Sequence, residues 1–574
     1  MLYTGEKLNP ITFKYLPAGL DITDYDAVSA CFDDLASRKP ANKDDLLELL
    51  RVHSDLLKAM ADELSWRYVR MTLNADNDAY EQAYNDYFAK AQAANEEKQF
   101  QIKQIYYNSP YRKELPEAEF ALLDQIMVNE ISLYREENIP LMVQESELAN
   151  KYGGIVSQMS APFDGEDRTV AQLAVYLKDP ERSKREAAWR LRVGLFVDKA
   201  AELDALYDEM KSLRHQLALN AGFSNYRDYK HQEMGRFSYT PEELYAFHDA
   251  VEKVVIPFVK EKDEHRRQCL GLKQLRPWDL SVDLDGRKLQ PFETTDEFIQ
   301  KSLKVLNKVH PDYARQLEMM QNTGLLDLEN RKGKAPGGYN TSINNLASSF
   351  IFMNHVKLHN DVVTLLHESG HAMHSAATRN IPWAQYLETP SEVAELASMT
   401  MELLTMDYWD EFYPTTSDLK KAKRDQLEGT LSFLPWCMTV DAFQHWVYLH
   451  PEARGEEHND AYLQITQRFN TLTDWSGLEA MRRHMWKQQL HIFEVPFYYI
   501  EYGMAQLGAL SIYMNYRQNK AKALQQYQAF MELGYSKSVK EIYQTAGIDF
   551  DFSEARIREL VDFVRQELAE VDKL

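Results

Sequence analysis

The sequence predicts a mainly α-helical protein with a small β-sheet beside one central helix. Long stretches rich in Ala, Leu, Glu and Lys carry apolar residues at helical spacing. Two later stretches, 276–291 and 332–354, contain turn residues and short β-prone pieces instead. Because the β-prone residues 348–353 come just before a helix predicted over 361–378, we expect the sheet to lie beside that helix.

The predicted helices follow one another along most of the chain. They are expected over residues 25–105, 117–137, 140–151 and 182–220, and over almost all of 361–574. Asn108-Ser109-Pro110 predicts a break, and Tyr152-Gly153-Gly154 predicts a turn. We expect an N-terminal helical region over residues 1–155 and a larger second region over 156–574.

The helix predicted over 361–378 contains His367-Glu368-Ser369-Gly370-His371, an HExxH motif. Asn360 or Asp361 is expected to cap its start. Residues i and i+4 share a face of a helix, so His367 and His371 can direct two imidazoles at one metal ion. Glu368 lies beside them, where a general base would act on water. The motif therefore predicts a zinc hydrolase, although HExxH also occurs by chance on ordinary helices.

A catalytic zinc usually has three protein ligands, and four downstream glutamates compete for the third place. Thr389, Pro390 and Glu392 have the order of a capping box, which gives Glu392 a structural task. Glu395 lies further into the same predicted helix, and we favour it as the ligand. Glu388 and Glu392 remain alternatives. Glu402, seven residues after Glu395, is either an orienting partner of a ligand or a solvated helix residue.

His374 shares the approximate face of His367 but lies about 10 Å further along the axis at about 1.5 Å per residue. One ion at about 2 Å from three histidines is hard to arrange on a straight helix. We therefore expect His374 to be a neighbour of the site or a core histidine with a hydrogen bond.

Composition excludes several classes of function. The chain has 65 Lys and Arg against 88 Asp and Glu, a net charge of −23, which argues against nucleic acid as the main partner. No window of about 18 apolar residues predicts a membrane helix, and no signal-peptide pattern opens the sequence. Cys31, Cys269 and Cys437 are far apart, as expected in a reducing cytoplasm.

The motifs together resemble the thimet oligopeptidase/oligoendopeptidase F family of zinc metallopeptidases, most closely its oligoendopeptidase F and Pz-peptidase branch. The family's HExGHxxH helix matches His367 to His374, and its ExxS helix matches Glu395, Ser398 and Glu402. Further similar segments are Arg276-Pro277-Trp278-Asp279, Gly337-Gly338-Tyr339, Phe350-Ile351-Phe352, and His491 with residues 496–502. The similarity is good over about residues 160–574, whereas the N-terminal part matches only in length and helicity.

The resemblance implies a two-lobed helical shell around a deep channel that admits short unfolded peptides and excludes folded proteins. It implies one zinc per chain at a gluzincin-type site, with residues 156–574 as the catalytic region. Hydrolysis of an amide needs donors for the oxyanion, and Tyr498, Tyr502 and His491 are donors of the right type. Tyr499 is another such donor, but we favour Tyr498 and Tyr502 over it. Because aromatic residues also pack between helices, these three and Tyr499 could equally be core residues. Residues 337–352, including Gly337, Gly338 and Tyr339, would hold substrate backbone by strand addition, or form an ordinary sheet edge.

Three functions compete on these observations. The first is a metallo-endopeptidase acting on oligopeptides, with Glu368 as general base. The second is a dipeptidyl carboxypeptidase on the same site, which would need a cationic group for a free carboxylate. The third is a peptide-binding protein without catalysis, which would not need Glu368.

Overall fold

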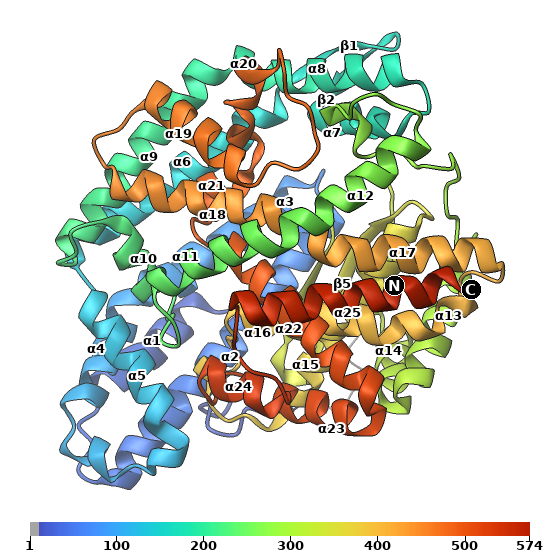
Figure 1. The fold of residues 1–574 in the computed structure, drawn as a ribbon. Helices are drawn as coiled ribbons and strands as arrows, with labels where there is room; N and C mark the ends of the chain where they lie inside the picture. Colours follow the sequence, from blue (N-terminus) through green and yellow to red (C-terminus); the bar gives the residue numbers. More distant parts are fainter. Residues whose placement is uncertain (1–10) are drawn as a thin grey trace. The chain divides into compact units, whose positions relative to one another are not determined.

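The computed structural model describes residues 11–574, and helices make up most of it (Figure 1). The chain divides into two compact units, each assembled from three separate stretches. Unit 1 contains residues 11–132, 289–422 and 508–550. Unit 2 contains residues 133–288, 423–507 and 551–574. The predicted mainly helical fold is confirmed.

Unit 1 contains the helix that carries the HExxH motif. Its helices are α1 (Tyr25–Ser37), α2 (Lys43–Leu73), α3 (Asp78–Tyr87), α4 (Glu96–Asn108), α5 (Glu117–Leu133), α13 (Thr295–Val309), α14 (Pro311–Thr323), α15 (His359–Ala377), α16 (Ser391–Thr405), α23 (Lys520–Met531) and α24 (Val539–Thr545). Two more helices, α17 (Thr416–Ser432) and α22 (Tyr499–Gln518), are divided between the units, and the last residue of α5, Leu133, also belongs to unit 2.

A three-stranded sheet of order β3-β5-β4 lies directly before α15 in the chain. Its strands are β3 (Leu326–Glu329), β4 (Tyr339–Ile343) and β5 (Ser348–His355). The central strand β5 runs parallel to β3 and antiparallel to β4, and it is buried along nearly all its length. Asn340 of β4 donates to the backbone oxygen of Glu368 at 3.1 Å, so the sheet is tied to α15 as predicted.

Helices α15 and α16 cross with almost no space between them at Gly370. A Cβ atom placed on Gly370 would lie 2.6 Å from the Cα atom of Ser398 and 2.9 Å from the carbonyl oxygen of Ala397. Real side chains do not approach backbone atoms so closely, so only glycine permits this crossing. The contact fixes the distance between the histidine face of α15 and the acidic residues of α16.

Unit 2 is also helical, and its aromatic core is large. Its elements are α6 (Ile139–Ser157), β1 (Ser160–Phe163), β2 (Glu166–Thr169), α7 (Val170–Val175), α8 (Arg182–Asp198), α9 (Ala200–Asn220), α10 (Tyr226–Glu233), α11 (Pro241–Ala250), α12 (Ile256–Cys269), α18 (Leu434–Leu449), α19 (Gly455–Arg468), α20 (Glu479–Arg482), α21 (Leu490–Glu494) and α25 (Glu554–Asp572). At its centre Trp486 and Phe493 stack, and Tyr207 packs against both rings at steep angles.

Two details differ from the predictions. Tyr152-Gly153-Gly154 does not form a turn, because α6 continues through it to Ser157. Tyr152 stacks on Phe493 with ring centroids 4.1 Å apart and donates to the backbone oxygen of Lys487, and this packing holds the helix despite two glycines. The segment 276–291 contains one short 3₁₀ turn, Pro277–Asp279, and no strand. Within residues 11–574, no helix combines the length and apolar character that crossing a bilayer requires.

The crossing at Gly370 gives a stability prediction with an internal control. Gly370→Ala forces a methyl group against the α16 backbone, and overpacking of this kind typically costs about 1–3 kcal/mol. Gly429 lies exposed in α17, and a methyl group added there would have no atom within 4 Å, so Gly429→Ala should stabilise by up to about 1 kcal/mol. Urea denaturation measures both, and equal effects at the two positions would contradict the packing argument.

Candidate metal and catalytic site

His367 and His371 lie one turn apart on α15, with ring centroids 5.0 Å apart and each side chain about a fifth exposed. The helix begins at His359, so the N-cap residue is Leu358 and not the expected Asn360 or Asp361. Asp361 still caps the helix, but from its third position, by accepting the backbone N–H groups of Val356 and Leu358. The helix start is therefore fixed, and both imidazoles have a defined direction.

Glu395 of α16 completes a group of three possible metal ligands. Its carboxylate oxygen lies 3.2 Å from Nε2 of His367 and 3.8 Å from Nε2 of His371. One ligand atom from each of the three residues lies within 4.8 Å of the others, and no other group in residues 11–574 meets this spacing. The donor set of two imidazole nitrogens and one carboxylate oxygen suits a catalytic zinc, which keeps a fourth position open.

The neighbouring groups hold these ligands in place. Nδ1 of His367 donates to Glu402 at 2.7 Å, which leaves Nε2 directed at the metal position. Ser398 donates to the Glu395 carboxylate at 3.0 Å. Glu402 is thus a buried partner of His367, a candidate ligand, and not a solvated helix residue, and the residues that match the family's ExxS helix all contact the group of three or each other.

Glu368 is buried beside the histidines, and Asn340 binds its backbone oxygen. Burial raises the pKa of its carboxyl group to about 7; His367 opposes this shift, while Glu395 and Glu402 add to it. Burial lowers the pKa of His367, but its bonds to Glu395 and Glu402 outweigh burial and raise it. Burial raises the pKa of Glu395, but the adjacent His367 and His371 outweigh it, and the pKa falls to about 2.

The alternative ligands lie elsewhere in unit 1. Glu388 lies near Glu130 and Lys103, outside the group of three. The predicted capping box is wrong, because Pro390 adopts an extended conformation as the N-cap residue and α16 begins only at Ser391, without a side-chain cap. Glu392 is 1% exposed, and its backbone oxygen accepts from Tyr543.

His374 is buried in the core, as expected, but within the described residues its Nε2 atom lacks the expected hydrogen bond. Its ring meets Phe530 edge-on at 6.2 Å, and its Nε2 atom is buried without a hydrogen-bond partner in the described residues. Burial lowers its pKa to about 3. It is not part of the group of three.

Gly337, Gly338 and Tyr339 have clear structural tasks. Gly337 has φ +97°, which favours glycine, and a Cβ on Gly338 would lie 3.3 Å from the backbone oxygen of Phe352. The Tyr339 ring stacks on Phe352, and its hydroxyl lies 2.6 Å from the hydroxyl of Thr72. A substrate-binding role for this segment therefore depends on its backbone, since β4 is an edge strand within the sheet.

His491, Tyr498, Tyr499 and Tyr502 lie together in unit 2. The rings of Tyr498 and Tyr502 are 5.3 Å apart, and the ring of His491 lies 5.0 to 6.2 Å from all three tyrosines. All four side chains are partly exposed, so they are not simply buried core residues. Tyr498 precedes the first residue of α22, so the expected single helix through Tyr498 and Tyr502 starts one residue later.

A short hydrogen-bond chain determines the tautomer of His491. The indole N–H of Trp436 can only donate, and it donates to Oε1 of Gln489 at 3.0 Å. The amide nitrogen of Gln489 then donates to Nδ1 of His491 at 2.6 Å. Neutral His491 therefore carries its proton on Nε2 and can donate from that atom, and burial lowers its pKa. Sequence reasoning missed Gln489 and Asn340 because no spacing rule links them to their partners.

The turn before Tyr498 has a strained backbone. Phe497 has φ +66°, a conformation that non-glycine residues rarely adopt. Its backbone N–H donates to Gln444, and its backbone oxygen accepts from Arg236, which is itself paired with buried Glu501. Backbone strain held by several contacts is typical of functional positions.

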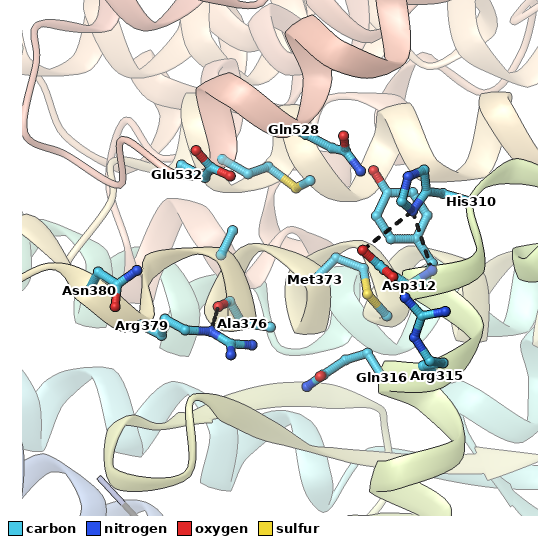
Figure 2. A pocket seen from close by; sticks show the side chains of 13 residues that line it. His310, Asp312, Arg315, Gln316, Met373, Ala376, Arg379, Asn380, Gln528 and Glu532 are labelled. Atoms are coloured by element: carbon cyan, nitrogen blue, oxygen red, sulfur yellow. Dashed lines mark hydrogen bonds and ion pairs between the residues drawn. The ribbon is translucent and has the colours of Figure 1, made fainter. Parts of the chain in front are cut away.

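The opposite face of α15 lines a separate cavity of about 810 Å³ in unit 1. Figure 2 shows Met373, Ala376 and Arg379 on one side and Gln528 with Glu532 on the other. None of the three candidate metal ligands lines this cavity. Helix α15 thus presents its histidines on one face and a mixed polar cavity on the other.

Comparison with known proteins gives consistent matches. A family model described as "Peptidase family M3" matches residues 175–562, and one described as "Peptidase M3 N-terminal domain" matches residues 19–133. An oligoendopeptidase F homolog of Lactococcus lactis subsp. lactis is 22% identical over 93% of this chain and 92% of its own. A homolog from Borreliella burgdorferi is 25% identical, and the match spans 56% of this chain and about half, 54%, of the relative. The solved structure of "PZ peptidase A with inhibitor 2" has a TM-score of 0.88 and 26% identity, covering 98% of this chain and 100% of the other.

The geometry predicts which glutamate controls metal content. Glu395→Gln should lower the bound zinc measured by plasma mass spectrometry well below one per chain, because it removes an anionic ligand. Glu388→Gln is the matched control and should keep the metal, since Glu388 is outside the group. Loss of zinc from the Glu388 variant alone would overturn the assignment.

Proposed function

Because the chain belongs to peptidase family M3, we propose that it is a zinc-dependent metallo-endopeptidase that cleaves internal bonds of short unfolded oligopeptides. The observation that carries this proposal is the group of His367, His371 and Glu395, with Glu402 holding the Nδ1 atom of His367. Three protein ligands and an orienting carboxylate are typical of a catalytic zinc rather than a structural one.

Glu368 is the general base in this mechanism. A zinc ion bound by the three ligands would polarise the scissile carbonyl and lower the pKa of water at the site towards about 7. Glu368 accepts the proton of the attacking water and later donates it to the leaving nitrogen. Its burial beside the histidines and the hydrogen bond from Asn340 to its backbone oxygen, which ties α15 to the sheet at this residue, support this role.

Tyr498, Tyr502 and His491 would stabilise the oxyanion. Their partial exposure, the Nε2 proton of His491 and the strained turn at Phe497 support a role as directed donors. Tyr499, whose ring contacts His491 and Tyr502, would bind substrate beside them.

Residues 337–339 and strand β4 would bind the substrate backbone by strand addition. The edge position of β4 supports this role, Gly337 provides the positive φ of the turn before it, and Gly338 lets the backbone approach Phe352 of β5 closely. The substrates would then be extended peptides, because strand addition uses main-chain groups. Unpaired cysteines in the described residues support a cytoplasmic location for such a peptidase.

An internally quenched peptide blocked at both ends tests the function. We expect cleavage at an internal bond, loss of cleavage with a chelator, and recovery with zinc. Glu368→Gln should keep zinc and the fold but lose about 10²–10⁴-fold or more of kcat, because the base is not a ligand. Zinc binding without cleavage would indicate a binding protein. Cleavage only of peptides with a free C-terminus would indicate a carboxypeptidase.

Kinetic measurements on variants can show whether the tyrosines act in catalysis or only pack in the core. An interaction made only in the transition state lowers kcat more than it raises KM when it is lost. We expect Tyr498→Phe or Tyr502→Phe to lower kcat by at least about tenfold, with zinc content and Tm unchanged. Tyr499→Phe is the comparison within the same cluster and should act mainly on KM. If both of the first two variants keep parental kcat, the oxyanion donors lie elsewhere, and His491 becomes the next position to test.

A further inference from the structure

Unit 2 contains another cavity, of about 270 Å³, to whose walls five aromatic rings contribute. Trp189 of α8, Trp436 of α18 and Trp475 contribute indole rings, and Tyr462 and Phe469 of the α19 region contribute two more rings. Its volume lies just below the usual range for small-molecule sites, about 300–1,000 Å³, so it suits one ring-sized group. None of the residues that line it is an aspartate or a glutamate.

One cation, Arg482, lines this apolar cavity. Its guanidinium donates to the backbone oxygen of Thr466 and to Asn470, both at 3.0 Å, and lies 4.6 Å from the ring centroid of Trp475. No carboxylate in residues 11–574 pairs with Arg482, and burial lowers its pKa. A guanidinium carries five N–H donors, and a partly buried one is normally matched by an anion.

The segment Arg276-Pro277-Trp278-Asp279 forms a rigid part of the cavity wall. Asp279 is fully buried and accepts from Arg182 and Arg185 at 2.7 to 3.0 Å. Pro277 lines the cavity, and Arg276 pairs at 3.0 Å with Asp474, the neighbour of Trp475. This segment, conspicuous in the sequence but outside the metal site, therefore positions two walls of the cavity.

We propose that this cavity binds the C-terminal residue of a peptide when that residue is aromatic, with its ring among the indoles and its carboxylate on Arg482. Ring–ring contacts favour an aromatic over an aliphatic side chain. A guanidinium pairs with a carboxylate through two parallel hydrogen bonds. The absence of acidic lining residues disfavours a free amino acid, whose ammonium group would have no anionic partner. The choice of a peptide as the source of the carboxylate rests on the proposed peptidase function.

Calorimetric titration of the full chain with three small probes tests this inference. N-acetylphenylalanine carries the ring and the carboxylate, N-acetylphenylalaninamide lacks the charge, and free phenylalanine adds an ammonium group. We expect the acetylated acid to bind about tenfold or more tightly than the amide, because charge-assisted hydrogen bonds are the strong ones. Free phenylalanine should bind more weakly than the acetylated acid.

Substitutions test whether Arg482 causes the preference for the acid over the amide. Arg482→Met keeps an apolar stem on Trp475 and should abolish the preference for acid over amide, while Arg482→Lys keeps a charge and should retain part of it. Arg483→Met is the matched control, because Arg483 pairs with Glu456 and Asp460 and does not line the cavity. It should keep the wild-type preference. Circular dichroism establishes that each variant is folded.

Three results would overturn the inference: no binding of the acetylated acid by the wild-type chain, equal binding of acid and amide, or a preference that survives in Arg482→Met. Equal binding of free phenylalanine would overturn the assignment to peptides. These titrations need neither zinc nor turnover. An inactive chain that keeps the acid preference would therefore contradict the proposed function and not the cavity.

Discussion

The crossing of α15 and α16 at Gly370 is the constraint on which the candidate site depends. With no Cβ on Gly370, the α16 backbone at Ser398 comes within contact distance of α15. Glu395 and Glu402 of α16 thereby reach the ring nitrogens of His367. A longer separation between the helices would leave the histidine pair without its carboxylate partners. A packing requirement, and not the ligands alone, therefore sets the geometry of the donor set.

The charge balance of this site also favours a bound cation. Glu368, Glu395 and Glu402 are each 8% exposed, and the imidazoles of His367 and His371 lie within 4 Å of Glu395. Buried carboxylates without compensation are costly, and the repulsion among them adds to the desolvation penalty. A divalent cation between the histidines and Glu395 would offset both the desolvation penalty and the repulsion among the carboxylates. Metal binding and stability of this region are therefore expected to be coupled.

The sequence predicted what is local and periodic. The structure confirms the predicted helix that carries His367 and His371 and the predicted strand before it. The matches to family M3 confirm the resemblance to oligoendopeptidase F. The three expected ligands meet in space, although the capping-box argument that favoured Glu395 was wrong. The hairpin of β1 and β2 was missed, despite the Asp164-Gly165 turn signal. Long-range partners such as Asn340 have no sequence signal, since only tertiary packing brings its side chain to the backbone of Glu368, 28 residues later.

Anomalous diffraction at the zinc edge, from crystals of enzyme that cleaves peptides, tests the central claim most directly. We expect one strong anomalous peak per chain, at about 2.0–2.2 Å from Nε2 of His367, Nε2 of His371 and a carboxylate oxygen of Glu395. A peak bound instead by His374 or Glu388, or active crystals with no peak at these three residues, would contradict it.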